Sequence, residues 1–75
     1  YIYKEFKNYI KMTFKKTSLH TWEALSKNIT YYIDLETFNG EGNMYYLTIL
    51  DGNVVLENGL SFFKLNSAKQ YAKQY

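Results

Sequence analysis

The chain has no cysteine, no proline and no arginine, and its only histidine is His20. Without cysteine it forms no disulfide bond, no thiolate metal site and no cysteine nucleophile. A single histidine excludes a histidine-rich metal site and every catalytic arrangement that needs two histidines. Arginine is the usual reader of guanine and of phosphate, so its absence disfavours sequence-specific nucleic-acid binding.

Long apolar runs are also missing. No stretch of about 18 consecutive apolar residues occurs, so the sequence predicts no transmembrane helix. Charged side chains are scattered through residues 1–10, which distinguishes this segment from the apolar core of a signal peptide. We therefore expect a cytoplasmic protein with no membrane partner.

The chain does have enough apolar material for one small core. Its 75 residues are 47% hydrophobic and 20% aromatic, which is typical of a folded globule. A chain this short must bury nearly all of its large apolar side chains to offset the entropy of ordering it. We therefore expect residues 1–75 to form a single domain without a wide cofactor cavity.

The abundance of Lys, Asn, Tyr and Ile, with no Arg or Pro, is typical of an AT-rich genome.

Charge is distributed unevenly along the sequence. Residues 1–16 carry five lysines against one glutamate, a local charge of +4. Residues 17–66 carry six carboxylates against two lysines, a local charge of −4. Solvated helix and strand surfaces explain such a pattern, and so does a surface with two electrostatic faces that orients a charged partner.

The first segment has the period of an amphipathic helix. Ile2, Phe6, Ile10 and Phe14 recur every four residues, and lysines lie mainly on the other side. The spacing predicts a helix over residues 2–16.

A short second helix is predicted over residues 19–27. Three large apolar residues spaced three apart support it: Leu19, Trp22 and Leu25. Asn28 follows, and asparagine is one of the residues that end a helix in the left-handed conformation.

The apolar period then changes to two. Apolar and polar residues alternate over residues 29–36, the pattern of a strand with one solvated face. Further strands are predicted over residues 44–50 and 54–57. They are joined at Asp51-Gly52-Asn53, the strongest hairpin signal in the chain.

The end of the chain predicts a bulge and a last helix. Asn58-Gly59 indicates a bulge or tight turn, after which residues 60–65 continue the third strand or form a fourth. Ser67 and Gln70 form a capping box, so the helix is expected to begin at Ser67. Its inner face is predicted to contain Ala68, Tyr71, Ala72 and Tyr75.

Together these patterns predict an α+β fold. A three- to four-stranded antiparallel meander sheet is flanked by an N-terminal helix, with a short second helix, and by a C-terminal helix. Both flanking helices are expected on the sheet face that carries Ile29, Tyr31, Ile33 and Leu35.

Little in the sequence points to catalysis. Asp34 and Glu36 share one face of a strand, where a carboxylate pair can hold Mg²⁺ or divide acid and base roles. Alternating carboxylates are, however, common on the solvated face of a strand, where they deter edge-to-edge pairing, and we favour that interpretation. His20 has no companion that would make it a ligand or a base, and no glycine-rich phosphate loop occurs. We therefore expect a non-enzymatic protein without cofactor or metal.

Tyrosine is unusually abundant, with nine residues. Two adjacent pairs lie inside predicted strands, so the rings of each pair point to opposite faces of the sheet: Tyr31-Tyr32 and Tyr45-Tyr46. If Tyr31 and Tyr46 point inward, the opposite face is a candidate protein interface made of Tyr32, Asp34, Glu36 and Tyr45. Tyrosines would anchor a partner there, and carboxylates would select a basic one. The alternative is that a helix covers this face and the rings belong to the core.

Two function classes follow. The first is a protein-binding module, of the type of the small inhibitors and adaptors with which phages and mobile elements occlude or bridge a partner protein. The second is a nucleic-acid-binding domain that uses lysines on its helices: Lys4, Lys7, Lys11 and Lys15.

Two loose resemblances bear on the second class. The tail from Gly59-Leu60 to Ser67-Ala68-Lys69-Gln70 resembles the sheet-plus-helix arm domains of tyrosine recombinases, which implies DNA binding. The α-β-β-β-α order resembles a double-stranded-RNA-binding domain. Arm domains carry basic residues on their strands, whereas these strands are acidic. The RNA-binding pattern has several basic residues at the start of its last helix, where this chain has Lys69 alone.

Overall fold

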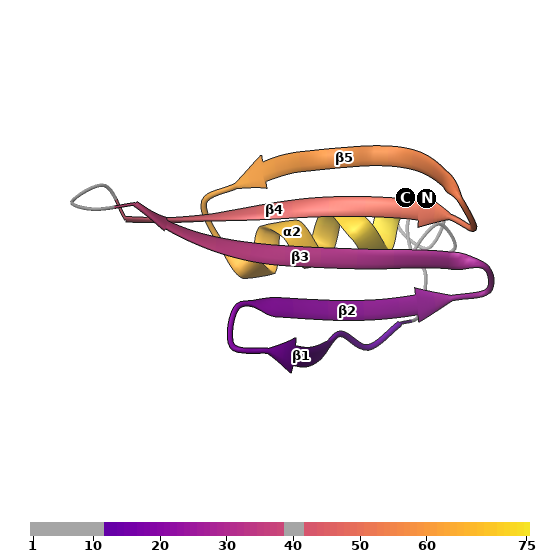
Figure 1. Ribbon diagram of the computed structural model, residues 1–75, viewed down its shortest axis with the longest axis horizontal. Helices are drawn as coiled ribbons and strands as arrows, with labels where there is room; N and C mark the ends of the chain where they lie inside the picture. Colours follow the sequence, from indigo (N-terminus) through magenta and orange to yellow (C-terminus); the bar gives the residue numbers. More distant parts are fainter. Residues whose placement is uncertain (1–11, 39–41) are drawn as a thin grey trace, which may run out of the picture.

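A computed structural model describes residues 12–38 and 42–75, which form a five-stranded antiparallel sheet followed by a helix (Figure 1). The elements are β1 (Lys15–Ser18), β2 (Thr21–Ser26), β3 (Ile29–Phe38), β4 (Gly42–Asp51), β5 (Val54–Phe62) and α2 (Leu65–Gln74). The strand order is β1-β2-β3-β4-β5, so every strand pairs with its neighbours in the chain and the sheet is a meander. None of the described residues belongs to a helix of the length and hydropathy needed to cross a membrane.

The core lies between one face of the sheet and α2. Its buried residues are Ala24 of β2, Tyr31 and Ile33 of β3, Leu47 and Ile49 of β4, and Ala68 and Ala72 of α2. The strand residues follow the period of two expected of strands that turn one face to a core. The helix turns two alanines to the sheet, and their small side chains let its backbone lie close to the strands. The predicted α+β class and antiparallel meander are therefore confirmed, but the sheet has five strands where three or four were predicted.

Two glycines occupy the turn and the bulge that the sequence predicted. Gly52 has a φ of +61° in the β4–β5 hairpin, where Asp51 pairs with Val54. Gly59 has a φ of +71°, and the register of β4 against β5 shifts beside it, between Leu47 and Ile49. A left-handed backbone conformation costs glycine little free energy, so a glycine in the sequence predicts both the turn and the bulge. The strand continues past the bulge, as one of the two predicted alternatives has it.

The N-terminal helix predicted over residues 2–16 is wrong where the structure describes it. Residues 2–11 lie outside the described residues, and Lys15–Ser18 form β1. β1 pairs with β2 through a tight turn at Leu19 and His20, with Ser18 opposite Thr21. Phe14 packs against the core from irregular chain, with its ring 6.4 Å from that of Tyr31. The apolar residue at the end of the helical stripe therefore reaches the core without a helix.

The second predicted helix, over residues 19–27, is a strand. Trp22 packs against the core, whereas Leu19 and Leu25 are 73% and 67% exposed. The three apolar residues that suggested helical spacing therefore belong to different surfaces. The chain turns at Lys27, whose φ is +59°, so the left-handed residue is Lys27 and not the predicted Asn28.

The C-terminal helix begins earlier than the capping box indicated. It begins at Leu65, after an N-cap Lys64 in extended conformation that makes no side-chain capping bond. The predicted inner face is confirmed at Ala68 and Ala72, but the residues Tyr71 and Tyr75 are 38% and 45% exposed. The earlier start is consistent with docking, because Leu65 itself packs against the core.

The uncapped start of α2 leads to a stability prediction. We expect Lys64→Asp to raise the free energy of unfolding by about 1 kcal/mol, because an aspartate at the N-cap accepts a bond from a free backbone N–H and offsets the helix dipole. Chemical denaturation with circular dichroism measures the change. Ser67→Ala is the control and should cost less than about 0.5 kcal/mol, since Ser67 is not the N-cap. The reverse ranking would restore the helix start that the sequence indicated.

Candidate functional site

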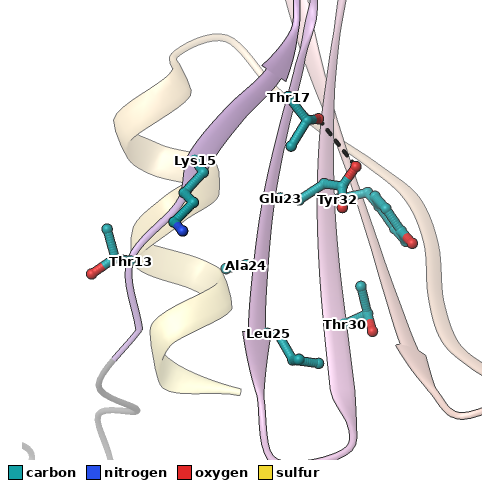
Figure 2. A pocket seen from close by; sticks show the side chains of 8 residues that line it. All are labelled: Thr13, Lys15, Thr17, Glu23, Ala24, Leu25, Thr30 and Tyr32. Carbon is teal, nitrogen blue, oxygen red and sulfur yellow. Dashed lines mark hydrogen bonds between the residues drawn. The ribbon is translucent and has the colours of Figure 1, made fainter.

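One face of the sheet is left uncovered by the described helix. α2 contacts β3, β4 and β5 from the core side, and Figure 1 shows it lying behind these strands. We call the opposite side the open face. Its residues alternate with the buried ones: Thr21, Glu23 and Leu25 on β2, Thr30, Tyr32, Asp34 and Glu36 on β3, and Met44, Tyr46, Thr48 and Leu50 on β4. Figure 2 shows Tyr32 and Ala24 pointing to opposite sides of the sheet, with Ala24 toward the helix.

The strand register divides the open face into two halves. At the end near the β2–β3 and β4–β5 turns, one cross-strand row is mainly apolar: Leu25, Thr30, Leu50 and Val55. We call it the apolar row. Leu25 and Val55 in this row are 67% and 55% exposed. Toward the other end lie two further rows, Thr21-Asp34-Tyr46-Ser61 and Glu36-Met44. The open face is thus apolar at one end and acidic and aromatic at the other.

Threonine hydroxyls orient two of its carboxylates. Thr21 Oγ1 donates to Asp34 Oδ1 over 2.9 Å, in a part-buried hydrogen bond between neighbouring strands. Thr17 Oγ1 donates to Glu23 Oε2 over 3.1 Å (Figure 2). A neutral hydroxyl holds a carboxylate in place but leaves its negative charge uncompensated. The open face therefore presents Glu23 and Asp34 with their carboxylates held in place.

Two shallow hollows lie beside these carboxylates. The larger, of about 550 Å³, is lined by Thr13, Lys15, Thr17, Glu23, Ala24, Leu25, Thr30 and Tyr32 (Figure 2). The smaller, of about 440 Å³, is lined by His20, Thr21, Asp34, Leu35, Glu36 and Thr37. Both hollows are therefore lined mainly by residues of the open face and of the neighbouring edge of the sheet.

The structure brings together three of the four residues predicted as a protein interface. Tyr32, Asp34 and Glu36 lie on the open face, and Tyr32 is half-buried. Tyr45 lies on the helix side, because it pairs with Leu35 and packs against the core, 6.1 Å from the ring of Trp22.

Tyr46, opposite Asp34, takes the place on the open face that the sequence assigned to Tyr45. Only the pairing of β3 with β4 identifies it. The sequence shows that the adjacent tyrosines point to opposite faces, but not which of them points inward.

Of the four lysines proposed for nucleic-acid contact, the structure describes only Lys15. Lys4, Lys7 and Lys11 lie outside the described residues. Lys15 is exposed on β1, directly opposite Glu23. Lys15 therefore lies on a strand and not on the predicted lysine-bearing helix.

Two features of the described part of the chain bear on catalytic chemistry. There, no group of three or more His, Asp or Glu side chains is arranged to hold a metal ion. The hydroxyl of Tyr31 is buried without a hydrogen-bond partner among the described residues. Burial raises the pKa of Tyr31, and the nearby Tyr75 adds to the rise. This hydroxyl stays protonated at neutral pH and lies inside the core, so we assign it a packing role.

Comparison with protein-family models, curated proteins and solved structures finds no match for this chain. The functional argument therefore rests on the open face itself.

Proposed function

We propose that this chain is a small non-enzymatic protein-binding module that acts by covering part of a partner protein, as an inhibitor or an adaptor does. The observation that carries the proposal is the open face, a sheet surface that α2 does not cover. It offers two tyrosines, oriented carboxylates and exposed aliphatic side chains. Sheet surfaces of this composition suit protein interfaces, because tyrosine buries a large area at a low cost in side-chain entropy.

Tyr32 and Tyr46 are the proposed anchors. Tyr46 lies opposite Asp34, two residues along β3 from Tyr32, so the two tyrosines are diagonal neighbours near the centre of the sheet. Residues that dominate binding are enriched in tyrosine and lie at the centre of an interface, within a rim that excludes water. Asp34 and Glu36 beside them would speed the encounter with a basic partner.

The test is affinity capture with quantitative mass spectrometry, using the wild-type chain and two tyrosine variants. We expect a partner that is retained by wild type and by Tyr71→Ala, a control on α2, which packs on the other side of the sheet. Tyr32→Ala should weaken binding by about 2 kcal/mol or more, roughly thirtyfold, the size expected of a central anchor. Thermal melts of both variants check that the fold is intact. Equal retention of the partner by Tyr32→Ala would remove the open face as the binding site.

The nucleic-acid hypothesis is tested in parallel. At about 150 mM salt we expect only non-specific binding to DNA or RNA, with Kd values of roughly 10⁻⁴–10⁻⁶ M. The reason is the acidic strand surface together with the absence of arginine. A nanomolar complex that Lys7→Glu and Lys11→Glu weaken would overturn this expectation and reverse the two hypotheses.

A further inference from the structure

We infer that the segment bound by the open face is an amphipathic helix of about three turns, with lysine or arginine along one flank. The inference rests on the proposed protein-binding function and adds the chemistry of the partner. Two features of the open face carry it: the direction of the apolar row, and the side on which its carboxylates lie.

The apolar row runs across the strands, not along one of them. Leu25, Thr30, Leu50 and Val55 lie directly opposite one another on four neighbouring strands. Neighbouring strands are about 4.8 Å apart, so the row is about 14 Å long. A helix rises about 1.5 Å per residue, so roughly ten residues cover this length. A helix laid along the row places apolar side chains from successive turns on Leu25, Leu50 and Val55.

Among the described residues, all the carboxylates of the open face lie to one side of this row. Glu23 is two residues from Leu25 along β2, and Asp34 and Glu36 lie further along β3 in the same direction. One such step is about 6.8 Å, so Glu23 is within reach of a long cationic side chain on the flank of a docked helix, whereas Asp34 and Glu36 lie two and three steps from the row, roughly 14 and 20 Å. Glu23 is therefore the carboxylate that a cation on the docked helix contacts, and Asp34 and Glu36 add a weaker attraction at longer range.

The same charges disfavour a second copy of this chain as the occupant. Two open faces packed against each other would bring a second set of these carboxylates into one interface. Like charges at an interface cost several kcal/mol, so face-to-face dimerisation is opposed. A basic helix is attracted by the same carboxylates. Because they lie on one side of the row, they also determine which flank of the helix faces them.

The experiment is a selection of random twelve-residue peptides displayed on phage against the full chain. We expect enriched peptides with leucine, isoleucine or phenylalanine at helical spacing and with lysine or arginine on one flank. A synthetic peptide of the enriched sequence is then titrated by calorimetry. Leu25→Ala should weaken its binding roughly tenfold or more. Leu19→Ala, which removes an equally exposed leucine outside the row, should leave the affinity unchanged.

The charge half of the inference has its own variant. Glu23→Gln combined with Asp34→Asn keeps the side-chain shapes, and should weaken binding and flatten its dependence on salt. Enriched peptides without basic residues that Tyr32→Ala still weakens would overturn the inference and leave the protein-binding proposal standing. Peptides insensitive to both Tyr32→Ala and Leu25→Ala would overturn both. Failure to enrich any sequence, or concentration-dependent dimerisation lost in Leu25→Ala, would also overturn the inference.

Discussion

Leu47→Ala is expected to lower the free energy of unfolding by about 2–5 kcal/mol. Leu47 is fully buried between β4 and the helix, in the same core cluster as Ala68 and Ala72. Truncation removes apolar contacts and leaves a cavity that the surrounding sheet fills only in part. In a domain of this size the loss is a large share of the total stability, so the variant should melt many degrees lower or be unfolded at room temperature. Urea denaturation followed by circular dichroism measures it.

Leu25→Ala is the matched control for that experiment. Leu25 is 67% exposed on the open face, so its truncation should cost less than about 0.5 kcal/mol. If Leu25→Ala proved as damaging as Leu47→Ala, the open face would be covered in the folded protein. That result would contradict the binding surface proposed above as well as the packing.

Ala72→Leu tests the close approach of α2 to the sheet. Ala72 is fully buried, and a leucine there must push the helix away from the strands or adopt a strained rotamer. We expect a loss of about 1–3 kcal/mol, the usual cost of overpacking a core. The measurement is thermal or urea unfolding, with Asn66→Leu, an exposed change on the same helix, as the reference. An Ala72→Leu variant as stable as Asn66→Leu would mean that the helix does not rest on its alanines.

The strands β3, β4 and β5 and the two alanines on the inner face of α2 could be predicted because their signals are local. A period of two along residues 29–36 indicates a strand whatever it pairs with. Asp51-Gly52-Asn53 and Gly59 mark places where backbone geometry itself favours glycine. Alanines four residues apart on a helix share one side, so Ala68 and Ala72 were found together. In each case the physical cause acts within a few residues of chain.

The first two strands were missed because their cause is not local. Lys15–Ser18 has four exposed residues and no apolar alternation, so only pairing with β2 makes it a strand. In β2, Leu25 points to the open face while Trp22 packs on the core, and apolar spacing alone reads such a pair as helical. The exposed Leu25 therefore gives β2 the apolar spacing of a helix. In the structure the same residue lies in the apolar row of the candidate site.

The sequence likewise placed only part of the candidate site. Strand alternation alone placed Tyr32, Asp34 and Glu36 on one face, because successive side chains of a strand must point to opposite sides. Whether that face is covered, and whether Tyr45 or Tyr46 shares it, depends on how β3 pairs with β4 and on which side α2 packs. A shift of one residue in that pairing would exchange the two tyrosines. The sequence by itself thus determined which side chains of β3 share a face and where the chain turns sharply. The tertiary structure decided which face lies against the helix. Both faces carry large aromatic and aliphatic residues, so only packing distinguishes them.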